Sequence, residues 1–351
     1  MPSAPERTGS RPPRIRDVAA RAGVGVGTVS RVLNDAPGVA AATRERVRAV
    51  MEELGYRPSV AARNLSLGRT QTLGVIAPFF TQASVVERLR GVDEVVGASP
   101  YHLTICNVET REQRRDVMRR FARRDRLDGV LVISLPPTDA EAHALRRDGL
   151  AVVLVDAIHG DLPHVVVDDV AGGALAARHL LDAGHRRIAF VGDVEDNPFG
   201  FASSERRLRG LRREVERTGL ELPPEYVRRG PFGRETAGGM ALDLLALAEP
   251  PTAVFAASDV QAFGVLDAAA RAGLSVPGDL SVIGYDDIEL AGAIGLTTVR
   301  QPLRESGRLG ASLLLRALED ELSLDEHHDL GGLAVVERRT TGQVPCPHGR
   351  P

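Results

Sequence analysis

A pair of short helical patterns joined by a tight turn lies near the start of the chain, over residues 15–34. Gly23 ends the first pattern, because glycine tolerates the left-handed backbone of a sharp turn. Thr28, Ser30 and Arg31 lie largely off the apolar face of the second pattern, as reading base edges in a DNA major groove requires. A surface hairpin with no DNA-binding role fits the same pattern. The apolar faces consist of Val18, Ala19 and Ala22 in the first helix and Val29, Val32 and Leu33 in the second.

The charge of the chain is divided unevenly. Residues 1–70 hold twelve arginines and six acidic side chains, so they carry +6, and the remainder carries −9 of the formal net charge of −3. A basic head that contacts phosphates and an acidic body that does not would produce this division. Chance segregation of charge is the alternative.

Composition excludes several classes of protein. With 351 residues the chain is long enough for two or three domains. It has no run of eighteen apolar residues, so no membrane span is expected. Residues 1–13 are polar and lack the apolar core of a secretory signal, which predicts a disordered arm. Cys106 and Cys346 are far apart in sequence and are expected to be reduced thiols in the cytoplasm.

A third helical pattern over residues 43–55 completes a small helical domain. It gives three amphipathic helices that can share a core, so residues 14–57 are expected to form a helix-turn-helix DNA-binding domain. Residues 58–70 predict a short hinge helix that forms conditionally, since one or two turns do not persist alone in water. Leu65 near its end could wedge into a minor groove. Alternatively, this segment is a plain linker with Leu65 packed on the body.

From residue 72 onward, apolar runs alternate with amphipathic helical patterns. Such alternation predicts parallel sheets that are covered by helices on both faces. Two sets of runs imply two lobes, and ligands of such sheets bind beyond the carboxyl ends of the strands. The expected strands lie at 73–77, 103–106, 129–133 and 151–155, then at 187–192, 253–256 and 280–284.

Polar and aromatic residues follow these strand ends. Aromatic faces together with carboxylates and hydroxyls suit a polyhydroxylated ring, which stacks by its C–H face and donates its hydroxyls to oxygen acceptors. The alternative for each single aspartate is a helix cap. The expected effector-binding residues of this kind are Phe79, Phe80, Thr81, Asp156, Ser258, Asp259 and Asp286.

The head resembles the lactose-repressor (LacI/GalR) family of bacterial transcription regulators. The resemblance in the head rests on Asp17-Val18-Ala19, Ala22-Gly23-Val24, Thr28 to Asn34, Thr43-Arg44, Leu54-Gly55-Tyr56 and Pro58. In the body it rests on Gly184 to Ile188, Arg206 to Gly210, Pro277 to Ser281 and Val282 to Asp287. The resemblance implies an all-α helix-turn-helix head with a hinge helix, and an α/β body of two parallel-sheet lobes like those of periplasmic sugar-binding proteins. It also implies that Arg207 and Phe232 contact the effector along with Asp156 and Asp286.

Departures from the family pattern affect DNA recognition. Gly25 is a weaker helix cap than the family's usual serine. Val26 offers a base only apolar contact and Gly27 offers none, so sequence reading is expected to depend more on Arg31, which can hydrogen-bond a guanine. The residues expected at DNA are Ile15, Arg16, Val26, Gly27, Thr28, Ser30, Arg31, Asn34, Tyr56 and Leu65.

The resemblance further implies that the chain crosses between the lobes three times, near Val167, near Thr297-Thr298 and near His328. Residues 71–343 then form the effector-binding and dimerisation domain, followed by a tail at 344–351. The expected lobe boundaries are about 71–167 with 298–327 for the first lobe and about 168–297 with 328–343 for the second.

We expect a homodimeric repressor that leaves double-stranded operator DNA when a small molecule, with a carbohydrate favoured by the carboxylates, binds the body. A purine or nucleoside co-repressor that tightens DNA binding is the alternative. A solute-binding protein would need an export signal and leaves the head unexplained. An enzyme is not expected because the sequence offers no nucleophile or base constellation, and neither a metal site nor a cofactor is predicted.

Overall fold

The computed structural model describes residues 13–57, 70–121, 126–147, 149–195, 197, 199–319 and 326–344. The chain divides into two units, residues 1–71 and 72–351, which we call the head and the body. The expected hinge helix with Leu65, nearly all of the expected arm and most of the expected tail fall outside the described residues.

The head consists of three helices, α1 (Ile15–Ala22), α2 (Val26–Leu33) and α3 (Ala41–Glu53), as the sequence predicts. Gly23 adopts a left-handed φ of 64° at the turn, and Gly25 caps α2 without a side-chain hydrogen bond. The shared core contains the expected face of α1, and Val29 and Val32 of α2. From α3, Val47 and Val50 join this core.

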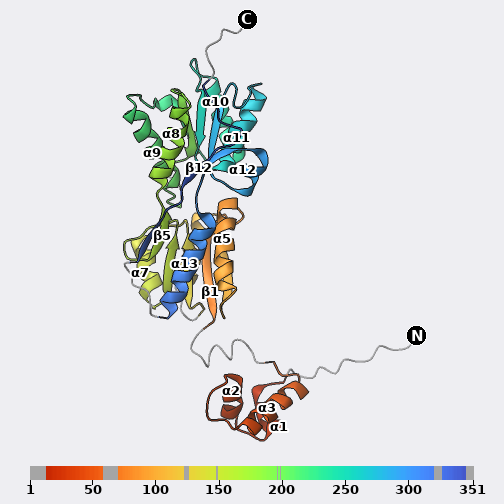
Figure 1. The fold of residues 1–351 in the computed structure, drawn as a ribbon. Coiled ribbons are helices and arrows are strands. Elements are labelled where there is room, and N and C mark those ends of the chain that lie inside the picture. The colour runs from red at the N-terminus through yellow and green to blue at the C-terminus, as the bar shows by residue number, and fades with distance from the viewer. Residues whose placement is uncertain are drawn as a thin grey trace, which may run out of the picture. The chain divides into compact units, whose positions relative to one another are not determined.

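The first lobe of the body is a six-stranded sheet in the order β11-β5-β4-β3-β1-β2, with every pair parallel. Helices α5 and α13 lie side by side on one face (Figure 1), and α6 and α7 contribute to the core on the other. The elements are β1 (Thr72–Pro78), α5 (Ala83–Val96), β2 (His102–Val108), α6 (Arg111–Phe121), β3 (Gly129–Ile133), α7 (Asp139–Arg147), β4 (Ala151–Val155), β5 (His164–Val167), α13 (Leu303–Leu318) and β11 (His327–Leu330).

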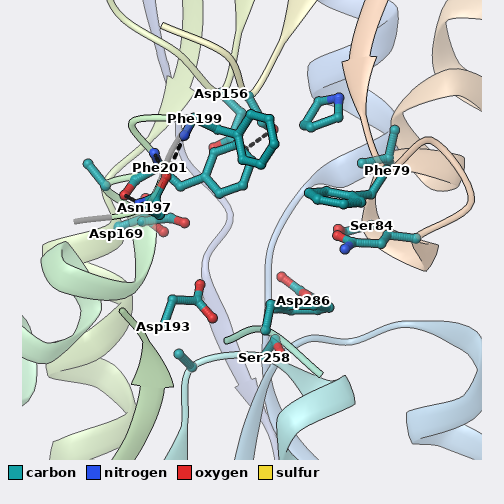
Figure 2. Close-up of a pocket in the computed structure, with 18 of the residues that line it drawn as sticks. Phe79, Ser84, Asp156, Asp169, Asp193, Asn197, Phe199, Phe201, Ser258 and Asp286 are labelled. Atoms are coloured by element: carbon teal, nitrogen blue, oxygen red, sulfur yellow. Dashed lines mark hydrogen bonds between the residues drawn. The ribbon is translucent and has the colours of Figure 1, made fainter. Parts of the chain in front are cut away.

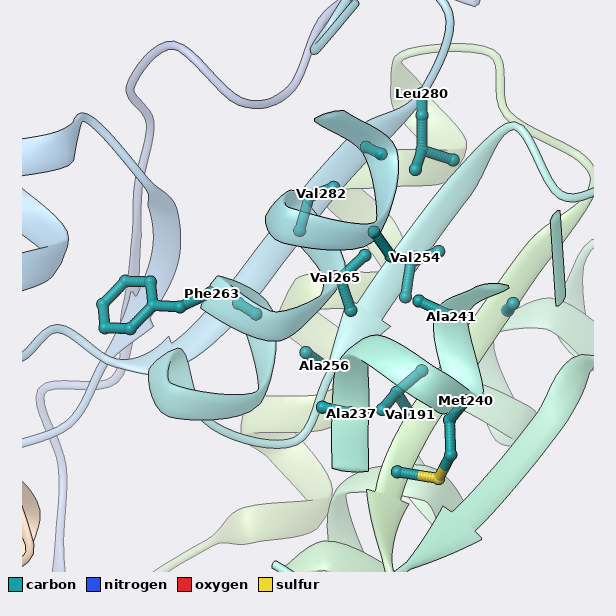
Figure 3. Close-up of a cluster of buried hydrophobic side chains, with 14 of the residues drawn as sticks. Val191, Ala237, Met240, Ala241, Val254, Ala256, Phe263, Val265, Leu280 and Val282 are labelled. Carbon is teal, nitrogen blue, oxygen red and sulfur yellow. The ribbon is translucent and has the colours of Figure 1, made fainter. Parts of the chain in front are cut away.

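The second lobe repeats this plan in the order β12-β10-β9-β8-β6-β7, with only β12 antiparallel. One face packs on α8 and α9 and the other on α10 and α11, and Figure 3 shows the buried cluster on the second of these faces. The elements are α8 (Asp169–Asp182), β6 (Ile188–Asp193), α9 (Ser203–Arg217), a 3-10 turn (Pro224–Tyr226), β7 (Val227–Gly230), α10 (Arg234–Leu245), β8 (Ala253–Ala256), α11 (Asp259–Arg271), β9 (Ser281–Asp286), α12 (Glu289–Ile294), β10 (Thr297–Arg300) and β12 (Ala334–Val336).

Two of the three expected crossings between the lobes are misplaced. The first lies after β5, at Val167, where it is expected. The second follows β10, because Thr297 and Thr298 still pair with β9 of the second lobe. The third follows β11, because His328 still pairs with β5 of the first lobe. The first lobe therefore includes β11 through Leu330, and the second lobe keeps β10, so the expected boundaries at 297/298 and 327/328 are wrong.

Glycines allow the helix pairs of both lobes to pack backbone against backbone. A Cβ on Gly307 of α13 would lie 1.9 Å from the carbonyl oxygen of Arg88 on α5. A Cβ on Gly173 of α8 would lie 2.0 Å from the carbonyl oxygen of Arg207 on α9. A side chain at either position would force the two helices apart, so these glycines fix the interhelical distance.

His185 has a different role from the helix capping that its place after α8 suggests. Its side chain is fully buried and contacts the hydroxyls of Thr252 and Ser281 and the carbonyl of Gly342. The ring thus connects the loops before β8 and β9 to the last described residues. Burial lowers the pKa of His185, which favours the neutral ring.

Candidate functional site

A cavity of about 560 Å³ lies between the two lobes of the body. It is lined from both lobes by residues at or just beyond the carboxyl ends of strands, which Figure 2 shows gathered around a common space. The sequence predicts this location, since ligands of open parallel sheets bind at that edge. The volume is within the range of small-molecule sites, roughly 300–1,000 Å³.

Arg207 is the central cation of the cavity. Its Nε donates to Asp169 Oδ1 at 2.8 Å and its Nη1 donates to the carbonyl of Ala257 at 2.6 Å. The guanidinium carbon lies 3.7 Å from the centroid of the Tyr285 ring, a cation–π contact. Burial opposes the charge, but Asp169 raises the pKa of Arg207, so the guanidinium stays protonated. These contacts hold Arg207 in one orientation toward Asp286, whose Oδ1 lies 4.0 Å from Nη1.

The second lobe supplies two further carboxylates at strand ends. Asp286 ends β9 and accepts a hydrogen bond from Gln301 Nε2 at 2.5 Å. Asp193 ends β6 and accepts one from Gln261 Nε2 at 3.0 Å. Burial raises the pKa of both carboxyls, against the opposing charge of Arg207. Each carboxyl has only a neutral side chain as its closest donor, so each has acceptor capacity left for a ligand.

The first lobe contributes a smaller polar group at the end of β4. Asp156 accepts from the Ser134 hydroxyl at 2.6 Å and lies 3.2 Å from Arg88 Nη2. Arg88 is almost fully buried, and its Nε has no hydrogen-bond partner within the described part of the chain. The cavity thus combines acceptors from both lobes with two oriented guanidinium groups.

Left-handed backbone recurs at residues that line this cavity. Phe79, Ser134, Asp156 and Asp286 have φ values of 44°, 53°, 57° and 119°. Non-glycine residues adopt such angles at a cost of about 1–3 kcal/mol each. Strain gathered at four strand ends around one cavity favours a binding site over incidental loop geometry.

The raised pKa of Asp286 predicts a measurable pH dependence of stability. Burial raises this pKa to about 6, whereas an unfolded aspartate titrates near about 3.9. Between these values the folded chain holds a proton that the unfolded chain has lost. The free energy of unfolding is therefore expected to fall as pH rises from about 4 to about 6, by at most about 3 kcal/mol from this group.

Urea unfolding of wild type and Asp286→Asn between pH 4.5 and 7 tests this expectation. The wild type should lose more stability than the variant as the pH rises. Asp243→Asn, at an exposed position on α10, controls for the change in net charge. Equal pH dependence in wild type and Asp286→Asn would contradict the assignment.

Six of the nine predicted effector residues line the cavity: Phe79, Asp156, Arg207, Phe232, Ser258 and Asp286. Phe80, Thr81 and Asp259 are not among the lining residues, so their placement in the site is withdrawn. Phe80 and Thr81 are exposed in the turn between β1 and α5. Asp259 is fully buried beneath the site, where it accepts from the Thr298 hydroxyl and the Ile288 N–H at 2.6 and 2.9 Å.

Several lining residues are missed by the sequence analysis. Asp193 follows the same strand-end rule as Asp156 and could have been found by it. Arg88 sits within a helical pattern and carries no signal of its role. The other missed polar residues include Asp169, Asn197, Gln261 and Gln301.

The predicted DNA-binding residues of the head lie on α1, on α2 and beyond α3. Arg16, Val26, Gly27 and Arg31 are exposed. The others within the described part of the chain are half-buried: Ile15, Thr28, Ser30, Asn34 and Tyr56. Ile15 and Tyr56 also pack against the head core. The exposed set leaves a hydrophobic contact and a guanidinium on α2 free to reach a ligand.

Within the described residues, no cluster of three or more histidine, cysteine or acidic side chains could hold a metal ion. Over the same residues, every helix is too short or too polar to cross a membrane.

Comparison with known proteins matches both units. Residues 14–59 match the model described as bacterial regulatory proteins, lacI family, and residues 177–341 match the periplasmic binding protein-like domain. The chain is 36% identical over 312 residues to the ribose operon repressor of Escherichia coli K12, covering 87% of this chain and 92% of that protein. It is 33% identical over 324 residues to the HTH-type transcriptional repressor PurR of Vibrio vulnificus, covering 88% and 92%.

A solved structure extends the likeness to the fold. The Lac repressor dimer bound to operator and the anti-inducer ONPF matches with a TM-score of 0.82 and 26% identity, covering 95% of this chain and all of that chain. All three proteins are repressors by name, and none is named as an enzyme.

Proposed function

The chain belongs to the LacI family of bacterial regulatory proteins, and we propose that it is a repressor that a carbohydrate releases from operator DNA. As a LacI-family repressor it binds DNA, and the effectors of such proteins include sugars and purines. We further propose that it acts as a homodimer, as the Lac repressor does on its operator. Because its target is bacterial DNA, we place the protein in the cytoplasm.

The carbohydrate assignment depends on one observation: carboxylates from strand ends of both lobes surround one cavity. Asp193 and Asp286 have acceptor capacity left by neutral partners, and sugar hydroxyls are donors that match it. Arg207 supplies a fixed donor for a ring or hydroxyl oxygen. A ligand held by both lobes favours their closed arrangement, and a differential affinity of a few kcal/mol is enough to change DNA affinity.

A purine or nucleoside co-repressor is the second candidate. The half-buried rings of Phe79 and Phe201 line the cavity and could stack on a flat base. The similarity to PurR of Vibrio vulnificus also favours this candidate. It predicts the opposite sign, since a co-repressor strengthens DNA binding.

The test is binding of the full-length protein to the promoter region upstream of its own gene, measured by fluorescence anisotropy. A carbohydrate effector is expected to weaken binding at least tenfold, with no change from purine bases or nucleosides. Strengthened binding with a purine would support the second candidate. Equal affinity for promoter and random DNA under all conditions would contradict the proposed function.

Arg31→Ala is expected to relax discrimination at one base pair in each half-site, by about 1–3 kcal/mol. The reason is that Arg31 is the exposed guanidinium on α2, beside Val26 and Gly27, which read bases poorly. The measurement is a competition titration against single-base operator variants. Arg48→Ala is the control, since Arg48 pairs with Asp35 on the head surface. A uniform loss of affinity for all DNA sequences would mean that Arg31 contacts only phosphate.

A further inference from the structure

Three phenylalanines form one wall of the cavity, and we call Phe79, Phe199 and Phe201 the aromatic wall. Phe79 follows β1 of the first lobe, while Phe199 and Phe201 lie between β6 and α9 of the second. The Phe199 ring meets Phe79 edge to face at 5.4 Å and stacks on Phe201 at 5.3 Å. Phe199 is buried and the outer two rings are half-buried. The wall therefore presents the outer rings to the cavity with Phe199 as their support.

The segment that carries this wall is held by hydrogen bonds from both lobes. Asn197 Oδ1 accepts from the backbone N–H groups of Phe199 and Phe201 at 3.1 and 2.8 Å, and Asn197 Nδ2 donates to the Phe201 carbonyl at 2.7 Å. Arg114 of α6 reaches across from the first lobe to donate to the Phe199 carbonyl at 2.9 Å. A ring surface fixed in this way costs little ordering when a ligand binds it.

Polar residues lie across the cavity from the wall. Figure 2 shows Asp193, Ser258 and Asp286 below the space and the rings of Phe199 and Phe201 above it. We call these three residues the polar floor. The floor accepts hydrogen bonds, and the wall offers apolar faces, so the two surfaces recognise different chemistry within one ligand.

The size of the cavity exceeds that of a single sugar ring. One water molecule takes about 30 Å³ in the liquid, so 560 Å³ corresponds to roughly 19 waters by that measure. A single hexose has fewer non-hydrogen atoms than this and cannot cover both the floor and the wall. Two linked rings can cover both.

We propose that the cavity takes a two-ring glycoside, with a sugar ring on the polar floor and a second ring, sugar or aryl, against the faces of Phe79 and Phe201. This inference rests on the proposed carbohydrate effector and adds a second subsite to it. The second ring is recognised by its face, because the polar groups that hold the wall are already used. Asn197 bonds its own loop, and Arg114 bonds the carbonyls of Phe199 and Pro136 and the carboxylate of Glu141. A nucleobase at the wall would leave its polar edges without partners, which is costly in a closed site.

Isothermal titration of the full-length protein with matched methyl and phenyl glycosides tests the second subsite. The probes are the methyl and phenyl β-glycosides of glucose, galactose, mannose and xylose. For the sugar that binds, the phenyl glycoside is expected to bind at least tenfold more tightly than the methyl glycoside. Phe201→Ala is expected to reduce that ratio to about twofold or less while the affinity for the methyl glycoside stays within about twofold.

Two further variants make the test specific. Phe201→Leu keeps bulk in the loop but removes the flat ring, so it is expected to reduce the ratio as well. Phe80→Ala is the matched control, because Phe80 neighbours Phe79 but does not line the cavity; it should keep the wild-type ratio.

A ratio near one in the wild type, or equal losses for both glycosides in Phe201→Leu, would overturn the second subsite and leave a monosaccharide effector standing. Failure of all the glycosides to bind would overturn the subsite too. The promoter titration described above decides the proposed function separately, since release by another metabolite would keep the repressor assignment.

Discussion

Gly173→Ala is expected to destabilise the body by about 3 kcal/mol or more, the upper range for overpacked interiors. In an ordinary helix the same change stabilises by about 0.5–1 kcal/mol. Here the added Cβ would lie 2.0 Å from the carbonyl oxygen and 2.7 Å from the carbonyl carbon of Arg207. Both atoms are backbone, so no side chain can rotate away, and α8 and α9 would have to separate. A lower urea midpoint with an unchanged slope would report the loss.

Gly239→Ala is the matched control, since a Cβ at Gly239 of α10 meets no atom within 4 Å. This variant is expected to be as stable as the wild type or slightly more stable. A Gly173→Ala midpoint at or above that of the wild type would show that the close approach of the two helices does not contribute to stability.

Arg207→Ala is expected to abolish the response to effector and to cost about 3–5 kcal/mol of stability at pH 7, as removal of one partner from a buried ion pair does. The cost arises because Asp169, which is 2% exposed, loses its guanidinium partner. Burial already raises the pKa of Asp169 against the pull of Arg207, so removal of the guanidinium raises this pKa further. The stability loss should therefore be smaller at pH 5, where the carboxyl takes up a proton.

Two variants separate the charge pair from simple loss of volume. Arg209→Ala removes an exposed arginine from the same helix and should leave stability and effector response near wild type. The double variant Arg207→Met with Asp169→Asn should recover much of the stability but not the response, because it leaves no buried charge unpaired. Unfolding in urea measures stability, and effector-dependent release of promoter DNA measures the response. Wild-type stability of Arg207→Ala would contradict this account of the pair.

The central strands could be predicted because they are buried on both faces and so are apolar throughout. This is the case for β3 and β4, whose residues are almost all buried. The edge strands β7 and β11 were missed, since Val227–Gly230 and His327–Leu330 are short and largely polar. The crossings were misplaced for the same reason: the pairing partners of β10 and β11 are set by tertiary contacts and not by local pattern.

The site could be predicted only where position along a strand implies position in space. Asp156 and Asp286 were found from the strand-end rule, and Arg207 and Phe232 from the family resemblance. The same rule misplaced Asp259, because the sequence does not tell which way a residue at the start of α11 points. Asn197 and Arg114 act through contacts that join distant segments, and no local spacing signals such a pair.

The late position of α13 in the chain has a consequence for biosynthesis. Leu313 and Leu314 of α13 fill the core beneath α5, yet this helix follows every strand of the second sheet except β12. During translation the first lobe must wait, with Val85 and Val92 of α5 uncovered, until the residues of the second lobe up to β10 have left the ribosome. The second lobe lacks only β12 at that stage, so the lobe whose synthesis starts later is positioned to fold first, in contrast to the usual amino-terminal order.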